Sequence, residues 1–308
     1  MPLPPLTDPT SPGLRARKLA VALPASSFLF GSLLAFNAAQ TASLLVKPLS
    51  PRAFRGFNRW TADTWWGWCV TGSRLLHAIE IQVSGDLVPS RENAIVIANH
   101  QQMPDITFLM MWAREKERLG DLKWIVKDAL KLVPGVGWGM VFLDCVFVKR
   151  DWTRDRASVE RAFEHLVRNR VPLWLISFPE GTRITPEKLE GARAHALERG
   201  LTPPRHVLVP RTKGFVASVQ ALRGHVAAVY DVTIGYEKGV PTLWQYIKGY
   251  APRAHLHVRR FPITELPDED GALATWLLDR FVEKDQLLED YYREGSFRGG
   301  SSSPPHLR

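Results

Sequence analysis

A long apolar stretch near the N-terminus is the first feature of the hydrophobic pattern. No charged residue occurs from Leu19 to Val46, and the stretch is longer than the roughly 20 residues that an α-helix needs to cross a bilayer. Pro24, Asn37 and Gln40 interrupt it, so the pattern also fits a kinked span or a re-entrant helical hairpin. A cleaved signal peptide is the rival interpretation, but the stretch is too long for the apolar region of such a peptide. We therefore expect a membrane anchor.

The segments around this stretch set the expected domain boundaries. Residues 1–14 are rich in Pro, Ser and Thr, and we expect them to form a disordered tail. Residues from Trp60 to Ile79 have a helical pattern dense in tryptophan, which suits a membrane interface and ordinary core packing equally well. Membrane-anchoring helices are thus expected over residues 15–80. Basic residues flank both ends of the apolar stretch, so charge does not predict an orientation.

Beyond this region the pattern becomes that of a soluble α/β domain, expected over residues 81–295. Short apolar runs predict buried strands at Ala94–Ala98, Trp124–Val126, Val141–Val148, Leu173–Phe178, Val207–Val209, Ala227–Ile234 and Leu256–Val258. Segments of helical period occur at Ile106–Arg118, Arg154–Arg168, Pro186–Arg199 and Gly271–Arg293. Strands that alternate with helices predict a mainly parallel central sheet flanked by helices. Residues 296–308 are rich in Gly, Ser and Pro and are expected to form a mobile tail.

The charge balance indicates an anionic partner. Lys and Arg number 40 against 31 Asp and Glu, which gives a formal charge of +9 and an isoelectric point near 9.7. Nucleic acid is disfavoured because no zinc-finger spacing, RNP-like signature or single basic helix occurs. Eleven tryptophans favour a bilayer surface or a phosphorylated substrate, although an excess of Arg can also be a solvated surface. The two cysteines cannot supply a disulfide scaffold or a four-ligand zinc site.

The first candidate for chemistry is the segment NHQQMPD, residues 99–105, which directly follows the apolar run AIVIA. A strand that leads into a polar turn and a helix places side chains at the carboxyl edge of a sheet, where α/β proteins bind ligands. His100 can pair with Asp105 only if the histidine precedes the helix and the aspartate lies in its first turn. Pro104 permits this geometry. Asp105 could then hold one imidazole nitrogen while the other takes a proton from an alcohol, although one such pair alone is a weak signal.

Three further segments carry candidate residues. The turn FPEGTR, residues 178–183, has a glycine that permits close approach of a ligand and an arginine suited to a phosphate. A plain surface turn with a Glu–Arg pair is an equal alternative for this segment. Lys213, in VPRTKGF, stands at the start of a predicted helix and could bind an anion. Lys127 and Arg150 lie at the ends of a glycine-rich apolar stretch, where ordinary loop chemistry would also explain them.

In this order, the four segments resemble the sequence blocks of the 1-acyl-glycerol-3-phosphate acyltransferase family. The pattern N-H-x4-D matches at Asn99, His100 and Asp105, F-P-E-G-T-R matches at every position, and V-P-x-x-x-G matches at residues 209–214. The block from Gly139 to Arg150 is longer than in the bacterial pattern and, with YDVTIGY and EKDQLLEDYY, resembles the eukaryotic branch. That branch includes lysophosphatidic acid, lysophosphatidylinositol and lysocardiolipin acyltransferases. The resemblance covers roughly residues 83–295.

The resemblance implies an acyl-CoA-dependent enzyme that transfers a fatty acyl chain directly to the free hydroxyl of a lysophospholipid. His100 would be the general base and Asp105 would orient its imidazole. The residues implied to contact the substrates are Asn99, Glu180, Gly181, Thr182, Arg183, Arg150, Lys127 and Lys213. Neither a metal nor a cofactor is implied, since acyl-CoA is a co-substrate. The implied location is the endoplasmic reticulum membrane, with the catalytic domain at the bilayer surface.

Several alternatives remain open from the sequence. Lysophosphatidic acid is the expected acceptor, with lysophosphatidylinositol or lysocardiolipin as the nearest alternative. A non-catalytic membrane protein of the same fold belongs to a different class, and the intact residues His100, Asp105, Glu180 and Arg183 argue against it. A hydrolase with a serine nucleophile is disfavoured because no G-x-S-x-G segment occurs.

Overall fold

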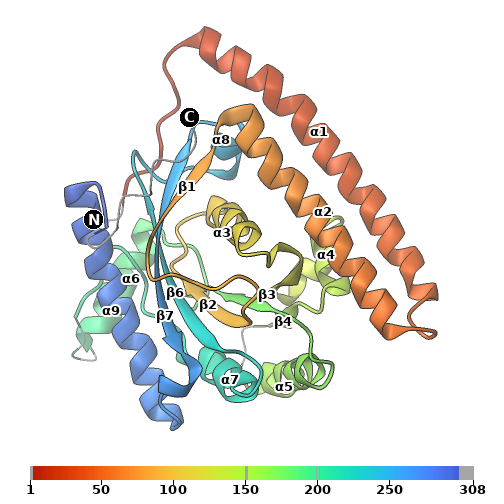
Figure 1. The fold of residues 1–308 in the computed structure, drawn as a ribbon. Coiled ribbons are helices and arrows are strands. Elements are labelled where there is room, and N and C mark those ends of the chain that lie inside the picture. Colours follow the sequence, from red (N-terminus) through yellow and green to blue (C-terminus); the bar gives the residue numbers. More distant parts are fainter. Residues whose placement is uncertain (1–2, 150–151, 199, 201, 298–308) are drawn as a thin grey trace.

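A computed structural model describes residues 3–149, 152–198, 200 and 202–297. Within these residues a seven-stranded sheet forms the centre of the molecule, with helices on both faces (Figure 1). The strands are β1 (Glu80–Gly85), β2 (Ala94–Ala98), β3 (Leu122–Lys127), β4 (Val146–Val148), β5 (Trp174–Ser177), β6 (Ala228–Tyr236) and β7 (Arg253–Pro262). The α-helices are α1 (Pro12–Ala42), α2 (Pro51–His77), α3 (Pro104–Glu115), α4 (Val136–Phe142), α5 (Trp152–Arg168), α6 (Pro186–Glu198), α7 (Thr212–Leu222), α8 (Leu243–Ile247) and α9 (Asp270–Glu294). Short 3-10 helices are η1 (Ser43–Leu45), η2 (Leu119–Asp121), η3 (Asp128–Leu132) and η4 (Ile263–Glu265).

The strand order of the sheet is β1-β7-β6-β2-β5-β3-β4. The five strands from β6 to β4 in this order are parallel to one another. β7 is antiparallel to β6, and β1 is parallel to β7. The prediction of a mainly parallel sheet flanked by helices is confirmed, with an oppositely directed pair of strands at one edge. Because the parallel strands share one direction, the carboxyl ends of β2, β5 and β6 meet at one edge of the sheet.

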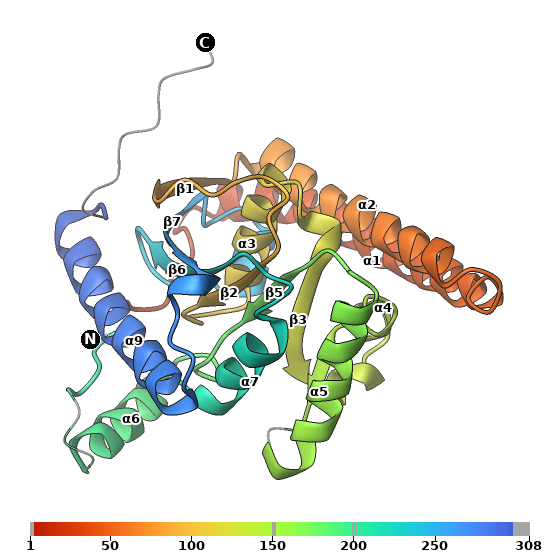
Figure 2. The same ribbon diagram turned by 60° about the horizontal axis from the view of Figure 1, so that its bottom comes forward.

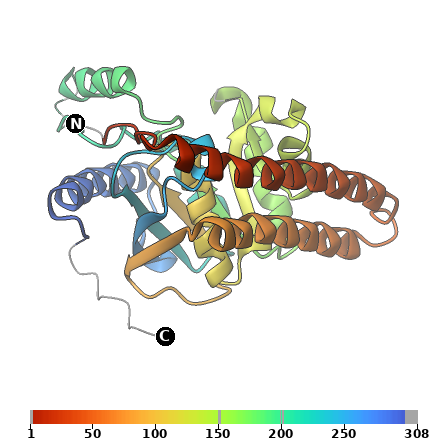
Figure 3. The same ribbon diagram turned by 90° about the horizontal axis from the view of Figure 1, so that it is seen from above.

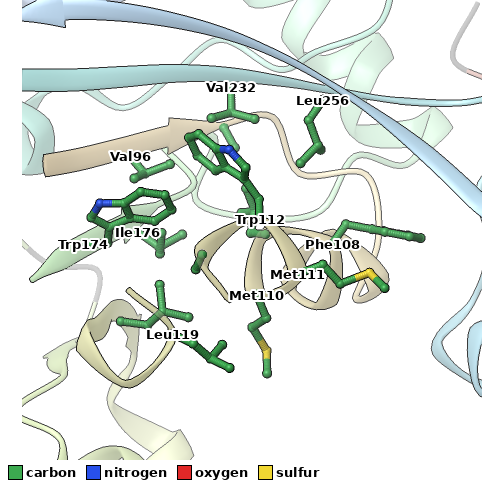
Figure 4. Close-up of a cluster of buried hydrophobic side chains, with 14 of the residues drawn as sticks. Val96, Phe108, Met110, Met111, Trp112, Leu119, Trp174, Ile176, Val232 and Leu256 are labelled. Carbon is green, nitrogen blue, oxygen red and sulfur yellow. The ribbon is translucent and has the colours of Figure 1, made fainter. Parts of the chain in front are cut away.

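Two apolar layers enclose the sheet. Every residue of β2 is buried, since alternate side chains enter opposite layers, and this explains its unbroken apolar sequence. In the layer under α3, Trp112 packs against Trp174 of β5 with ring centroids 4.6 Å apart (Figure 4). The opposite face is covered by α5, α7 and α9, which lie on the other side of the sheet from α3 (Figure 2).

α1 and α2 form a helical hairpin and lie side by side along most of their length (Figure 3). The polar residues that interrupt the apolar stretch face inward: Asn37 Nδ2 donates to Gln40 Oε1 (3.0 Å), and Gln40 Nε2 donates to Thr61 Oγ1 of α2 (3.2 Å). This pairing leaves apolar side chains such as Phe28 and Phe30 on the outer surface. The segment Pro12–Leu45 is long and apolar enough to cross a membrane, and only 11% of its most apolar window is buried. The apolar stretch is therefore not itself a re-entrant hairpin, because α1 is continuous from Pro12 to Ala42, and the hairpin forms between α1 and α2.

The other side of α2 attaches this hairpin to the α/β domain. Arg59 Nε donates to Asp121 Oδ1 in η2 (2.5 Å), and the backbone N–H of Gly120 donates to Asp63 Oδ1 (3.1 Å). A Cβ at Gly120 would lie 2.9 Å from the carbonyl oxygen of Arg59, so α2 and η2 pack closely only because this residue is a glycine. The hairpin is therefore an integral part of the domain.

The expected disordered tail over residues 1–14 is wrong for the described residues. The backbone N–H of Leu6 donates to the carbonyl of Val240, and that of Val240 donates to the carbonyl of Pro4 (both 2.9 Å). Asp8 pairs with Lys248 at 3.3 Å. α1 begins at Pro12, because proline at a first helical position needs no N–H partner. The sequence suggested a tail because it has no periodicity, yet an extended segment can be ordered by a single partner strand. Of the expected mobile tail, residues 298–308 lie outside the described residues.

Two strand predictions need correction, and one strand was missed. Val141–Val148 was expected to be one strand, but α4 occupies its first part. Within α4, Gly137 lies so close to Leu130 that a Cβ would meet the carbonyl oxygen of Leu130 at 1.7 Å. Val207–Val209 is buried loop, held from α9 by Asp285, whose carboxylate accepts from the backbone N–H of Val207 (3.2 Å). β1 was not predicted, because EIQVSG is an edge strand with mixed polar residues.

Candidate active site

The candidate site lies where β2, β5 and β6 end at the carboxyl edge of the sheet (Figure 1). His100 follows β2, the turn FPEGTR follows β5, and Tyr236 is the last residue of β6. The register confirms that these strands are neighbours, since Ile97 of β2 pairs with Ser177 of β5 and with Asp231 of β6. Segments that are far apart in the sequence therefore meet around one imidazole.

His100 and Asp105 form a hydrogen-bonded pair. The imidazole Nδ1 lies 2.9 Å from Asp105 Oδ2, with His100 before α3 and Asp105 in its first turn, as the sequence predicted. The Asp105 side chain is fully buried, whereas 13% of the His100 side chain is exposed. Because the carboxylate holds Nδ1, Nε2 is the nitrogen that can exchange a proton with a bound molecule.

Further contacts hold the His100 ring and its backbone. Phe178 stacks on the imidazole with ring centroids 4.1 Å apart and planes inclined by 17°. The backbone carbonyl of His100 accepts from Ile184 (3.0 Å), and its backbone N–H donates to Glu180 Oε1 (3.0 Å). The FPEGTR turn thus clamps the histidine through backbone and ring contacts. This arrangement preorganises a base, since the ring need not reorient before it accepts a proton.

Glu180 lies behind His100 and is 4% exposed. Burial raises the pKa of its carboxyl to about 8, although the backbone N–H groups of His100 and Leu208 act in the opposite direction. At pH 7 this carboxyl is therefore largely protonated. A neutral Glu180 adds no second negative charge beside Asp105, so the imidazole has one carboxylate partner. This buried position favours a role in which Glu180 holds the loop of His100. It argues against the contact with substrate that the sequence predicted for Glu180.

The outer part of the FPEGTR turn carries exposed cations. Arg183 donates to the side-chain oxygen of Gln102, in the loop between His100 and α3. Lys188 Nζ donates to Thr182 Oγ1 (2.7 Å). The side chain of Arg211 lies against Gly181, which has a φ of 71°, and a Cβ there would approach Arg211 Nε at 3.1 Å. Gly181 therefore serves both the left-handed turn and the close approach of a guanidinium.

Sequence reasoning missed two of these cations. Lys188 is in the first turn of α6. It follows Arg183 by five residues, and this closeness in sequence to the FPEGTR turn was the signal that could have identified it. Arg211 precedes Lys213 in the VPRTKGF segment and was passed over in favour of the lysine. The backbone N–H of Arg211 donates to the carbonyl of Pro179 (2.8 Å), which ties the two segments together.

The remaining predicted residues are more distant or have other partners. Asn99 is 1% exposed, and its amide donates to the carbonyl of Ile234 and accepts from its N–H (3.0 and 2.8 Å), which joins the loop to β6. Lys127 is exposed at the end of β3, and Lys213 is exposed in the first turn of α7. No side-chain contact within the described residues joins either lysine to His100. Arg150 lies outside the described residues.

Comparison with known proteins identifies the family of this chain. A family model described as acyltransferase matches residues 80–237, and a model described as acyltransferase C-terminus matches residues 245–308. The chain is 35% identical over 289 residues to 1-acyl-sn-glycerol-3-phosphate acyltransferase 2 of Arabidopsis thaliana, which covers 91% of this chain and 74% of that protein. It is 34% identical over 284 residues to the human 1-acyl-sn-glycerol-3-phosphate acyltransferase delta, covering 88% and 73%.

A solved structure shares the fold. The crystal structure of the 1-acyl-sn-glycerophosphate acyltransferase PlsC from Thermotoga maritima matches with a TM-score of 0.52 and 20% identity, over 88% of this chain and 97% of that chain. At this identity the likeness is one of fold, a seven-stranded sheet flanked by helices. The chain belongs to the acyltransferase family, as the sequence blocks predicted.

Proposed function

We propose that this acyltransferase moves a fatty acyl chain from acyl-CoA to the free hydroxyl of a lysophospholipid, with lysophosphatidic acid as the acceptor. The observation that carries the proposal is the position of His100, whose Nδ1 is held by buried Asp105 at 2.9 Å beside a turn of exposed cations. A general base next to an anion site suits an acceptor that has both a hydroxyl and a phosphate. The names of the Arabidopsis and human relatives support the choice of acceptor.

In the proposed reaction, His100 Nε2 removes the proton of the acceptor hydroxyl as the oxygen attacks the thioester carbonyl. The C–S bond of acyl-CoA then breaks, and the departing thiolate takes the proton from the imidazolium. Asp105 stabilises the imidazolium while it exists. An acyl-enzyme is unnecessary, and Cys145 is unsuited to form one, because burial raises the pKa of its thiol to about 11.

The acceptor phosphate would lie at the outer part of the FPEGTR turn. Arg183 offers a planar guanidinium that can bind two phosphate oxygens at once. Gly181 and Thr182 allow close approach, while Lys188 and Arg211 add positive charge on either side. Lys127 and Lys213 remain candidates for contacts to CoA or lipid phosphates, as does Arg150, which lies outside the described residues. Asn99 and Glu180 act behind the histidine, where they hold its loop.

Replacing Arg183 with alanine is expected to raise the KM for the acceptor about tenfold, since a charge-assisted hydrogen bond to phosphate contributes on the order of 1.5 kcal/mol. The KM for the acyl donor should change little. Initial rates at varied acceptor concentration measure the effect, with Arg183→Lys as the matched variant that keeps the charge but loses the planar fork. An unchanged acceptor KM in Arg183→Ala would remove the residue from the phosphate site.

The α1–α2 hairpin is the proposed membrane attachment. α1 carries its apolar side chains outward, and α2 is bonded to the domain through Arg59 and Asp63. If α1 crossed the bilayer, α2 and its ionic contacts would have to enter the hydrocarbon as well, at high cost. A hairpin that lies in one leaflet avoids this cost and keeps the active site at the headgroup level. We place the protein at the endoplasmic reticulum membrane on the resemblance alone.

Replacing both Phe28 and Phe30 with serine is expected to weaken binding to phospholipid vesicles at least tenfold, since each buried phenylalanine contributes about 1.5–3 kcal/mol. The two side chains are 60% and 59% exposed. Flotation of the full-length chain with vesicles containing phosphatidylserine measures the effect. Val282→Ser, at an exposed apolar residue of α9, is the matched control and should float like the unchanged protein. Equal flotation of the double variant would place the lipid contact elsewhere.

The proposed function is tested with the full-length protein in detergent, labelled oleoyl-CoA and a panel of lysophospholipids. We expect a labelled diacyl product from lysophosphatidic acid. A product from lysophosphatidylinositol or lysocardiolipin alone would reassign the headgroup while keeping the reaction. Thioester hydrolysis without any acylated lipid would indicate a hydrolase. No turnover in folded protein that binds acyl-CoA would contradict the proposal and favour a non-catalytic membrane role.

A further inference from the structure

Tyr236 reaches the catalytic pair from an element that the proposed mechanism does not use. It is the last residue of β6, in the segment YDVTIGY, and only 1% of it is exposed. Its hydroxyl donates to Asp105 Oδ1 at 2.5 Å. Phe108 of α3 packs against the tyrosine ring with centroids 5.9 Å apart and planes inclined by 64°. The ring is thus fixed between the sheet and α3, and its hydroxyl points at the carboxylate that orients His100.

The donors around Asp105 divide unequally between its two oxygens. Oδ2 accepts from His100 Nδ1 (2.9 Å) and from the backbone N–H groups of Gln101 (2.6 Å) and Gln102 (2.8 Å). Oδ1 has a single donor within the described residues, the hydroxyl of Tyr236. A fully buried carboxylate needs such donors to replace lost water. Tyr236 is therefore the group that holds Oδ1 and influences how the negative charge is shared between the two oxygens.

The other titratable groups that face this pair do not compete for the same oxygen. Glu180, from the turn after β5, is largely neutral at pH 7, because burial raises its pKa to about 8. Tyr246 of α8 and Tyr292 of α9 are also neutral, since burial raises the pKa of both hydroxyls. The Tyr292 hydroxyl donates to the side chain of Gln101 (3.2 Å). Lys284 of α9 attracts Glu180 in this region.

We propose that Tyr236 is a positioning residue for acyl transfer, which holds the Asp105 carboxylate in the orientation and at the basicity that His100 needs. The inference rests on the proposed role of His100 as general base. By donating to Oδ1, the hydroxyl draws negative charge away from the oxygen that faces the imidazole. Without the hydroxyl, the carboxylate attracts the imidazole proton more strongly, and only the donors to Oδ2 hold its orientation.

The test is Tyr236→Phe, which removes one oxygen atom and preserves the packed ring. We expect kcat to fall about tenfold, as for a lost hydrogen bond to a charged group, with the acceptor KM within about twofold of the unchanged protein. The acid limb of the profile of kcat/KM against pH should move upward by roughly half a pH unit. A purely structural role would lower the melting temperature without moving that limb.

Tyr230→Phe is the matched control. Tyr230 is a fully buried tyrosine of the same strand, and its hydroxyl donates to Glu92 (2.5 Å), away from the catalytic pair. This variant should keep the kcat and the acid limb of the unchanged protein. If the two tyrosine variants instead lose kcat equally, with equal drops in melting temperature and no movement of the limb, Tyr236 has no positioning role.

A second measurement makes the test independent of turnover. Diethyl pyrocarbonate modifies an imidazole only in its unprotonated form. The modified fraction of the His100 peptide, measured by mass spectrometry across a pH series, therefore reports the pH at which Nε2 becomes available. The midpoint of modification should move upward in Tyr236→Phe and stay in place in Tyr230→Phe. If the unchanged protein shows no acyl transfer, the proposed function fails while this midpoint still tests Tyr236. A midpoint, acid limb and kcat all equal to those of the unchanged protein would overturn the inference.

Discussion

Replacing His100 with alanine is expected to lower acyl transfer by about three orders of magnitude, the contribution typical of a general base. The loss should be in kcat, because the proposed anion site at Arg183 does not involve the imidazole. Removal of the ring leaves Asp105 with its two backbone donors and Tyr236, so the loop should keep its conformation. Formation of labelled product from oleoyl-CoA and lysophosphatidic acid measures the effect, with circular dichroism and vesicle flotation as checks on fold and attachment.

His165→Ala is the matched control for this variant. His165 lies on α5 with its Nε2 3.8 Å from Asp144, so it is a second His–Asp pair in the same chain. Its side chain is 48% exposed and has no place in the candidate site. We expect His165→Ala to retain full activity. If His100→Ala kept activity within tenfold of the unchanged protein, the base would have to be another group and the proposed mechanism would be wrong.

Replacing Lys284 with methionine is expected to lower the free energy of unfolding by about 3 kcal/mol, because a buried charge would lose a partner. Lys284 is fully buried, and its Nζ lies 2.6 Å from Asp231 Oδ1 and donates to the carbonyl of Val232 (2.7 Å). Burial lowers the pKa of this lysine, while Asp231 acts in the opposite direction. Chemical denaturation followed by circular dichroism measures the loss.

A double variant separates charge from packing. In Lys284→Met alone, the buried Asp231 carboxylate keeps its charge but loses its lysine partner. In Asp231→Asn/Lys284→Met, a neutral asparagine replaces that carboxylate, and we expect at least half of the lost stability to return. Arg259, which also pairs with Asp231 at 2.5 Å, keeps Glu283 as a partner in that variant. A double variant less stable than Lys284→Met would show that packing of the lysine stem, rather than its charge, carries the effect.

The pairing of His100 with Asp105 was predictable because its determinants are local. The run AIVIA, Pro104 and the spacing from His100 to Asp105 all lie within twelve residues, and each constrains the backbone directly. The central strands β2, β5 and β6 were predicted for the same reason, since strands buried on both faces have continuous apolar sequences.

What the sequence did not predict depends on partners distant in the chain. Val207–Val209 has the composition of a strand but is loop, because Asp285 supplies its hydrogen bonds from 78 residues away. Lys284 resembles an exposed helical lysine until the fold places Asp231 opposite it. The contact of Tyr236 with Asp105 spans 131 residues. Such pairs follow from strand order and register, which local periodicity does not encode.

The bonding of α2 to η2 has a mechanical consequence. Arg59 and Asp63 join the hairpin to the α/β domain that carries His100. The apolar surface of α1 and the imidazole are therefore held in one rigid unit, without a hinge between them in the described residues. If the proposed membrane attachment is right, the distance of the imidazole from the lipid plane is then a constant of the fold. Under the proposed function, the acceptor hydroxyl would have to come to that fixed distance to react. The packing of the surrounding membrane would then act on the rate through the substrate, with no movement of the protein.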